Sequence, residues 1–432
     1  MPEIRSELEQ LVRIPSISAD GFEPAQVRRS AEMTSELLRA RGLETRLLEI
    51  DGAHPAVLAT RPAPPGSPTV LLYAHHDVQP TGPVELWATD PFTPAERDGR
   101  LYGRGSADDK SGVVIHTGAL RAWQDAPPVG ITVLVEGEEE IGSAHLTAFL
   151  DTYEDLLRAD AVILADSGNW RVGQPALTTS LRGLVDCVVE VRTLDHAVHS
   201  GEYGGPVPDA LTALSRLLAS LHDERGNVAV AGLAEADADP LDLSEEEVRA
   251  WAGVRPPVRL TGRGSLTSRM WTRPAVSILG IDAPSIASAT NQLVPSARAK
   301  VSMRLAPGQD PAAASSALEE HLLSNAPWGS EVTVTHGAAA HPCRVVTQGD
   351  AFDAIRRALG EAWGGAPVEQ GTGGTIPLVA AFVERYPDAS LLLTGAGDPT
   401  SNLHSENESV DLGDLERSVV AEALFMGYLA GG

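Results

Sequence analysis

The sequence has little of what a disulfide-stabilised, membrane-spanning or nucleic-acid-binding protein needs. Its 432 residues include two cysteines, Cys187 and Cys343, whose positions fit neither a disulfide framework nor a metal-binding spacing. No apolar run approaches the roughly 20 residues that cross a bilayer. The formal net charge of -26 would repel both nucleic acid and anionic membranes. We therefore expect no nucleic-acid or membrane partner.

The start of the chain, MPEIRSELE, contains no apolar core of the signal-peptide type, which favours a cytoplasmic protein. The chain is 43% hydrophobic, which is enough for a large core, and its length favours two domains. With cysteine excluded, any metal site would have to be built from histidine, aspartate and glutamate.

Apolar strands that alternate with helical patterns indicate an α/β fold with a mostly parallel sheet. These strands are expected at 70–74, 131–135, 161–165 and 390–394. The middle third instead alternates apolar and polar residues, for example at 184–193 and 299–305, as half-exposed antiparallel strands do. We therefore predict a main domain with helices on both faces of the sheet, formed by 1–178 and 341–432, and an inserted α+β domain at 179–340.

Potential metal ligands follow each of the apolar strands. They are His75 and Asp77 after the first strand, Glu139 and Glu140 after the second, Asp166 after the third, His404 in the loop after the fourth, and Asp108 at the start of a helix. Each alone has an ordinary structural explanation, such as a helix cap or a solvated turn. Because parallel strands end at the same edge of a sheet, we expect the set to lie close together.

A cluster of this composition suits two divalent cations. Two such ions about 3.5–4 Å apart can share a bridging carboxylate and a bridging water. One further carboxylate must stay off the metals to accept the proton of that water. Glu139 and Glu140 can divide these roles, because neighbouring side chains diverge. Asp77 would then orient the imidazole of His75.

Several segments carry a resemblance to one family. They are YAHHDVQP at 73–80, GRGSADDK at 103–110, EGEEEIGS at 136–143, Asp166 after its strand, HSGEYGG at 199–205, RLAPGQD at 304–310, GGTIP at 373–377 and SNLHSENE at 401–408. In this order they resemble the M20 metallopeptidases, and within them the dipeptidase branch that includes carnosinase. The resemblance extends from the N-terminal helix to about Val410.

The resemblance implies a hydrolase with two divalent ions, most simply Zn²⁺, although the ligand types also admit Mn²⁺ or Co²⁺. His75 and Asp166 would bind one ion, Glu140 and His404 the other, and Asp108 would bridge them.

The resemblance also implies roles outside the ligand set. Glu139 would be the general base. The inserted domain would be a lid through which the protein forms a homodimer, and His199 would reach the partner subunit's site to stabilise the oxyanion. Arg304 and Thr375 would hold the carboxylate of the substrate.

Two segments depart from the family pattern. The segment DHAVHSG at 195–201 contains two candidates for the oxyanion role. We favour His199 over His196, because SGEYGG follows His199 directly. The segment 289–295 does not align cleanly with a polar residue of the family, and we take Asn291 as the substrate contact from the partner subunit.

The predicted function is hydrolysis of the peptide bond in dipeptides or short peptides that have a free C-terminal carboxylate. One alternative keeps the same machinery but removes the acyl or succinyl group from N-acylated amino acids. Another is a catalytically silent, dimeric scaffold of the same fold. The presence of Glu139 and of all five ligands argues against the silent scaffold.

Overall fold

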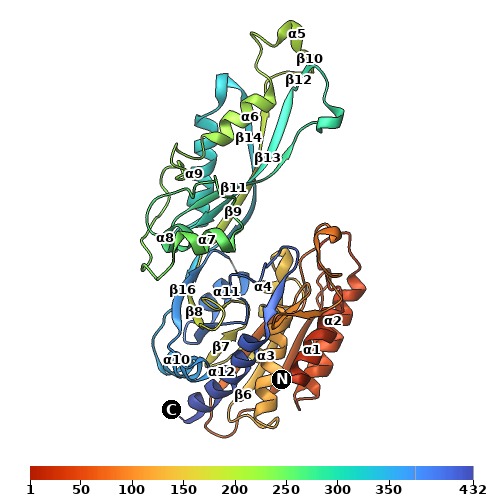
Figure 1. The fold of residues 1–432 in the computed structure, drawn as a ribbon, viewed down its shortest axis with the longest axis vertical. Helices are drawn as coiled ribbons and strands as arrows, with labels where there is room; N and C mark the ends of the chain where they lie inside the picture. The colour runs from red at the N-terminus through yellow and green to blue at the C-terminus, as the bar shows by residue number, and fades with distance from the viewer. Residues whose placement is uncertain (375, 432) are drawn as a thin grey trace. The chain divides into compact units, whose positions relative to one another are not determined.

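The computed structural model describes residues 1–374 and 376–431, and the chain divides into two compact units (Figure 1). The first unit contains Met1–Thr179, Val345–Gln370 and the chain from Ile376 onward. The second unit contains Ser180–Arg344 and a short segment that begins at Gly371. In the described part of the chain, no helix is long and apolar enough to cross a membrane.

The first unit is an α/β assembly. Its helices are α1 (Pro2–Val12), α2 (Pro24–Arg39), α3 (Lys110–Ala122), α4 (Leu146–Leu157), α10 (Asp350–Trp363), α11 (Pro377–Arg385) and α12 (Leu412–Gly431). Its strands are β1 (Glu44–Leu48), β2 (Ala56–Arg61), β3 (Thr69–His75), β4 (Ala95–Arg97), β5 (Arg100–Tyr102), β6 (Gly130–Glu136), β7 (Ala161–Leu164), β17 (Ser390–Leu393) and β18 (Ser409–Asp411), together with the starts of β8 (Ala176–Leu181) and β16 (Val368–Thr372). Short 3₁₀ turns are η1 (Val84–Leu86) and η2 (Glu139–Ile141).

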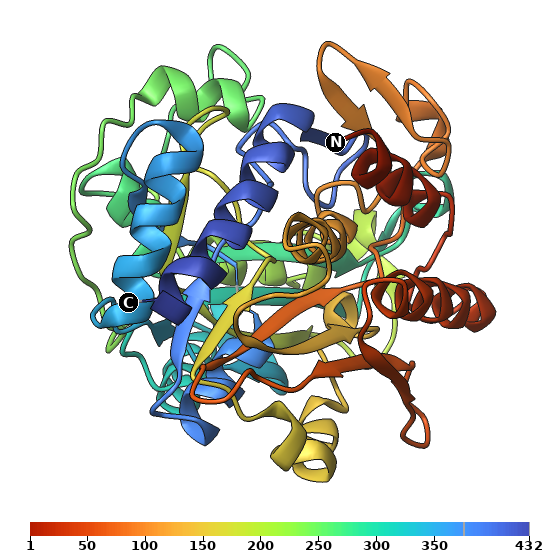
Figure 2. The ribbon, with the colours of Figure 1, turned by 90° about the horizontal axis from the view of Figure 1, so that it is seen from below.

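The main sheet is parallel at its centre and antiparallel at its edges. The strand order is β1-β2-β6-β3-β7-β17-β8, in which β3 pairs in parallel with β6 and β7, and β7 with β17. The outer strands β1, β2 and β8 pair antiparallel. Helices α2, α3, α10 and α12 lie on one face, with α1 packed against α3, and α4 and α11 lie on the other face (Figure 2). The predicted α/β class, with a mostly parallel sheet covered on both faces, is confirmed.

The central strand β3 forms because its sequence is apolar on both sides. Val70, Leu71 and Leu72 are completely buried, as expected for a parallel strand covered by helices on both faces. Each of these side chains contributes about 1.5–3 kcal/mol of burial free energy. The strand therefore holds His75, its last residue, at a fixed position on the edge of the sheet.

The helix α3, which begins at Lys110 inside the glycine-rich segment 103–112, is capped by Asp109 and not by Asp108. The side chain of Asp109 accepts a hydrogen bond from the backbone N–H of Gly112 at 3.1 Å. The peptide bond between Asp108 and Asp109 is cis. The ordinary explanation of Asp108 as a helix cap is therefore wrong, and its carboxylate makes other contacts.

The second unit is built on an antiparallel sheet. Its strands are β9 (Gly183–Arg192), β10 (Val198–His199), β11 (Ala275–Asp282), β12 (Gln292–Leu293), β13 (Ser296–Leu305), β14 (Glu331–Ala340) and β15 (Cys343–Arg344). Its helices are α5 (Ser200–Tyr203), α6 (Ala210–Ala219), α7 (Glu245–Trp251), α8 (Leu266–Trp271) and α9 (Pro311–Ser324), with 3₁₀ turns η3 (Ile286–Ser288) and η4 (Pro327–Gly329). The sheet order is β11-β13-β9-β14, and α6 and α9 share a hydrophobic core with β9 and β13.

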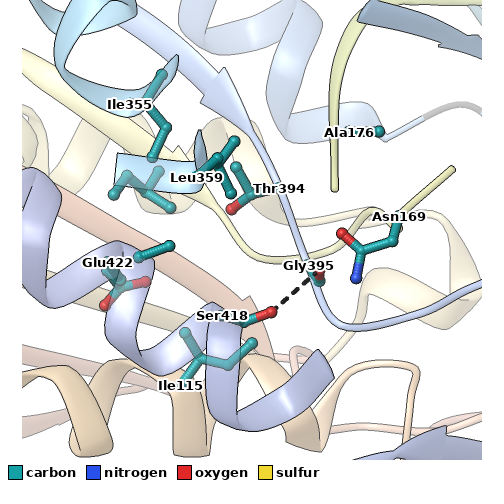
Figure 3. A pocket seen from close by; sticks show the side chains of 11 residues that line it. Ile115, Asn169, Ala176, Ile355, Leu359, Thr394, Gly395, Ser418 and Glu422 are labelled. Carbon is teal, nitrogen blue, oxygen red and sulfur yellow. Dashed lines mark hydrogen bonds between the residues drawn. The ribbon is translucent and has the colours of Figure 1, made fainter. Parts of the chain in front are cut away.

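An internal cavity of the first unit lies among α3, α10, α12 and β17, and Figure 3 shows its lining. Ile115, Leu359 and Glu422 are among the side chains that line it, and the hydroxyl of Ser418 donates to the carbonyl of Gly395 at 3.5 Å. Its volume is about 10 Å³. Since a single water needs roughly 10–15 Å³ by this measure, the cavity is too small for any substrate.

A buried ion pair beside this cavity joins three elements of the first unit. His116 on α3 places Nδ1 2.9 Å from a carboxylate oxygen of Glu422 on α12. Its Nε2 donates to the backbone carbonyl of Tyr73 on β3 at 3.0 Å. Burial lowers the pKa of His116, but the charge of Glu422 and its hydrogen bond outweigh this and raise the pKa overall. Because a carboxylate oxygen faces Nδ1 and a backbone carbonyl faces Nε2, both ring nitrogens act as donors and the imidazole is an imidazolium.

We predict that Glu422→Ala destabilises the protein by about 3–5 kcal/mol, because it leaves the buried imidazolium of His116 without its counter-charge. The measurement is equilibrium unfolding in urea. The matched control is Glu416→Ala, on the exposed face of the same helix, which should change the free energy of unfolding by no more than about 0.5 kcal/mol. Equal losses in both variants would contradict the prediction.

Candidate metal centre

The candidate metal centre lies where the parallel strands of the first unit end. His75 is the last residue of β3. Glu139 and Glu140 begin the 3₁₀ turn η2, which follows β6, and Asp166 lies just after β7. The strand β17 leads into the loop that carries His404. The expected convergence of strand ends therefore brings these side chains to one edge of the sheet.

Asp108 lies at the middle of this set. Its Oδ1 is 3.0 Å from Nε2 of His75, and its Oδ2 is 3.0 Å from Nε2 of His404. The same His75 Nε2 is 4.0 Å from Oδ1 of Asp166, and the same His404 Nε2 is 3.3 Å from Oε2 of Glu140. The two oxygens of one carboxylate thus face two different imidazoles, each of which has a further carboxylate beside it.

The donor set matches what a divalent transition metal prefers. His75 forms two groups whose ligand atoms all lie within 4.8 Å of one another, one with Glu139 and Asp166 and one with Asp108 and Glu140. Imidazole nitrogen and carboxylate oxygen bind zinc, manganese and cobalt. The side chains therefore fit the metal that the resemblance implies. Glu139 is close enough to serve either as a ligand or as a base.

The electrostatics of the cluster also favour bound cations. Burial raises the pKa of Glu139 and of Asp166 well above the ordinary value, and it raises that of Glu140. Burial acts in the same direction on Asp108, but hydrogen bonds from His404 and His75 outweigh it and hold its pKa well below the usual range. Buried carboxylates of this kind stay ionised together only when positive charge is placed among them.

The histidines supply part of that positive charge. Hydrogen bonds to Asp108 and Glu140 raise the pKa of His404 to about 11. Burial lowers the pKa of His75, but hydrogen bonds to Asp108 and Asp77 outweigh it and raise the pKa well above the ordinary value. Because a metal binds the neutral imidazole, we expect metal binding at this cluster to release protons.

Asp77 holds both His75 and the turn that carries the two glutamates. Nδ1 of His75 donates to the backbone carbonyl of Asp77 at 3.1 Å, which leaves Nε2 to face Asp108. The carboxylate of Asp77 accepts the backbone N–H groups of Glu139 and Glu140 at 3.3 and 3.1 Å. The hydroxyl of Ser18 donates to the same carboxylate at 2.7 Å. Asp77 therefore positions more of the site than the sequence pattern indicated.

Three further residues at the site were not predicted from the sequence. Gln79 donates to Oε2 of Glu140 at 2.8 Å, and the carboxylate of Asp109 accepts the backbone N–H of His75 at 3.2 Å. Glu408 accepts hydrogen bonds from the backbone of the loop that carries Asp108. These contacts join segments far apart in the chain, so no local pattern could have indicated them, although all three residues lie inside or next to the quoted motifs.

The predicted oxyanion and partner-subunit residues lie at one end of the second unit, near α5 (Figure 1). His199 on β10 pairs with Gln292 on β12, and the backbone carbonyl of Asn291 accepts the N–H of Ser200 at 3.0 Å. His199 and Asn291 therefore lie on neighbouring segments. His196 is exposed in the loop before β10.

The predicted carboxylate-binding residues belong to another part of the second unit. Arg304 lies near the end of β13, opposite Leu184 on β9. Burial and the charge of Arg304 together lower the pKa of Arg182 to about 10, so two guanidinium groups lie near each other there. Thr375 is outside the described residues.

Comparison with known proteins places these features in one family. The sequence profile of peptidase family M20/M25/M40 matches residues 71–426, a range that contains every predicted ligand. The chain belongs to the M20 family of peptidases. It is therefore a metallopeptidase, and divalent metal is the cofactor that its histidine and carboxylate cluster accommodates.

The relatives of this M20 peptidase include dipeptidases of bacteria and mammals. It is 36% identical to a cysteinylglycine-S-conjugate dipeptidase of Corynebacterium striatum, over 92% of this chain and 89% of the relative. It is 30% identical to a beta-Ala-His dipeptidase of Rattus norvegicus, over 83% of this chain and 76% of the relative. The crystal structure of human carnosine dipeptidase 1 superposes with a TM-score of 0.87 at 26% identity, covering 100% of this chain and 96% of that one.

We predict that Asp77→Ala weakens the binding of divalent metal by about 10–100-fold. The substitution removes the carboxylate that lies 3.4 Å from Nδ1 of His75 and accepts the backbone N–H groups of Glu139 and Glu140, although the backbone carbonyl at position 77 remains. The measurement is a competition titration against a chromophoric chelator. Ser18→Ala, which removes one hydrogen bond to the same carboxylate, should have a smaller effect. Metal affinity that is unchanged in Asp77→Ala would contradict the positioning role.

Proposed function

We propose that the protein hydrolyses the peptide bond of dipeptides and short peptides with a free C-terminal carboxylate, at a centre of two zinc ions. His75 and Asp166 would hold one ion, Glu140 and His404 would hold the other, and Asp108 would lie between them. The related enzymes named above are a cysteinylglycine-S-conjugate dipeptidase and beta-Ala-His dipeptidases, which favours a dipeptide substrate here.

One observation carries the proposal of two ions. The two oxygens of Asp108 face different histidines at the same distance, 3.0 Å, and the Nε2 atom of each histidine has another carboxylate oxygen within 4.0 Å. Each oxygen of Asp108 therefore has its own imidazole beside it and a further carboxylate within reach of that imidazole. This arrangement supports a bridging role for Asp108 between two ions.

The catalytic step would use Glu139 as the general base. Divalent ions bound at the cluster would lower the pKa of a water to about 7 and polarise the carbonyl of the substrate. The carboxylate of Glu139 would accept a proton from the water while the oxygen of that water attacks the carbonyl carbon of the substrate. Glu139 would then give the proton to the leaving nitrogen as the C–N bond breaks, and the products are a free amine and a free carboxylate.

Burial supports the choice of Glu139 for this task. Burial, together with the negative charge of Asp166, raises the pKa of Glu139 well above that of an ordinary glutamate. A raised pKa makes the carboxylate a better proton acceptor, which suits a general base. Glu140, the alternative, accepts a hydrogen bond from Gln79 and lies 3.3 Å from His404, which suits a ligand better.

The residues of the second unit would recognise the substrate. We infer from the family resemblance that Arg304 binds the C-terminal carboxylate through its planar guanidinium group, and that Thr375 contacts the same end. The partner subunit's His199 would stabilise the oxyanion in a homodimer, with Asn291 as a further contact. The second unit would then act as both the lid and the dimerisation domain.

We predict that Glu139→Gln binds two zinc ions as the wild type does but loses about 10²–10⁴-fold in kcat, because the amide cannot accept the proton. Metal content is measured by inductively coupled plasma mass spectrometry, and kcat is measured with a free dipeptide as substrate. His404→Ala should instead retain one ion. A Glu139→Gln protein that binds a single ion would make Glu139 a ligand, and one with near-normal turnover would exclude it as the base.

A substrate panel tests the proposed substrate class. Zinc-restored enzyme should cleave free dipeptides and lose most activity on the same dipeptides with an amidated C-terminus. Arg304→Met should raise KM on the free dipeptides and leave the amidated ones unchanged, because only the free carboxylate needs the guanidinium group. Cleavage confined to N-acetyl or N-succinyl amino acids would identify the protein as a deacylase. A protein that binds zinc but cleaves neither class would be the silent scaffold.

A further inference from the structure

The loop that carries His404 has a backbone that few residue types adopt. Asn402, His404 and Asn407 have φ values of 54°, 60° and 60°. The left-handed region is uncommon outside glycine, and such residues persist where surrounding contacts determine the backbone. The side chain of His404 is 57% exposed, so little packing holds it in place. Apart from its contacts with Asp108 and Glu140, the position of His404 therefore depends on contacts made by its neighbours in the chain.

Glu408, at the end of this loop, makes the strongest of those contacts. Its carboxylate is completely buried. Oε1 accepts the backbone N–H groups of Ala107 and Asp108 at 2.9 and 3.0 Å, and Oε2 accepts that of Gly105 at 3.0 Å. Oε2 also accepts from Nη1 of Arg104 at 2.7 Å. One side chain thus binds the backbone of the Asp108 loop at three places and is paired with a buried cation.

The surrounding contacts make this link rigid. Arg104 is 1% exposed, donates to the backbone carbonyl of Pro80 at 3.2 Å, and lies over the ring of Trp87 at 5.4 Å. The side chain of Asn407 donates to the backbone carbonyl of Leu86 at 3.1 Å. The strands β5 and β18, which flank the two loops, pair antiparallel. The two loops are therefore joined at several points, with Glu408 at the centre.

We propose that Glu408 is a positioning residue of the metal centre, whose buried carboxylate fixes the Asp108 loop and the His404 loop relative to each other so that Asp108 and His404 face the same ion. This inference rests on the proposed function, because it takes Asp108 and His404 as ligands. A carboxylate is needed here because both of its oxygens act only as acceptors. A glutamine offers one acceptor oxygen, and its amide group would face N–H donors.

The test is a zinc titration of metal-stripped Glu408→Gln by calorimetry. We expect one ion to bind as in the wild type and the ion held by His404 to bind about 10–100-fold more weakly. Excess zinc should restore kcat with little change in KM, which a general loss of structure would not allow. The matched control is Glu422→Gln, another buried carboxylate of the first unit, which should lower stability but leave both zinc affinities unchanged.

A second variant, Glu408→Asp, separates a loss of metal binding from a general loss of folding. It retains the charge beside Arg104 but is one methylene shorter, so it cannot reach all of the backbone donors at once. It should show the same selective loss of the second ion. Wild-type affinity for both ions in Glu408→Gln and Glu408→Asp would overturn the inference. A wild-type protein that binds fewer than two ions would instead contradict the proposed dinuclear centre, before any substitution at Glu408 is made.

Discussion

The repulsion among buried carboxylates is the constraint on which the rest of this structure depends. Glu139, Glu140 and Asp166 gather around Asp108, and burial raises the pKa of each of the first three. Such groups remain ionised together only with positive charge among them. The imidazole of His75 and the exposed His404 contribute some of it, and divalent metal, the cofactor of this metallopeptidase family, would contribute the rest. The histidines alone therefore leave part of the negative charge of the carboxylates without a positive partner.

The fold makes such a cluster possible because buried strands and hydrogen bonds hold the charged side chains in place. Parallel strands buried by helices on both faces end at one edge, and His75, Glu139, Glu140 and Asp166, four of the candidate ligands, lie at or just after these strand ends. Hydrogen bonds from residues behind the cluster then orient its side chains. Asp77 binds the imidazole of His75 and the backbone of the turn that carries the two glutamates. Glu408, at the end of the His404 loop, binds the backbone of the Asp108 loop. His404 is exposed, so packing contributes least to its position, and it depends most on such hydrogen bonds.

The sequence predicted the strand-end residues because they follow short apolar runs, a pattern that is local in the chain. The α/β class followed from the same runs. The contacts of Gln79 and Glu408 could not be predicted, since they join segments that only the fold brings together. The edge strand β11 also escaped prediction: Leu279 is 61% exposed and Ile281 51%, and a register shift near Gly280 removes the alternation that marks a strand. The helix cap at Asp109, one residue from Asp108, depended on backbone geometry that composition does not encode.

The central claim is that one carboxylate, that of Asp108, is shared by two metal ions. X-ray diffraction from crystals of the zinc-loaded protein, recorded at the zinc absorption edge, tests it most directly. The account predicts two anomalous peaks, one against His75 and one against His404, with an oxygen of Asp108 coordinating each. A single peak, or two peaks that leave the Asp108 carboxylate outside coordination distance of either, would contradict it.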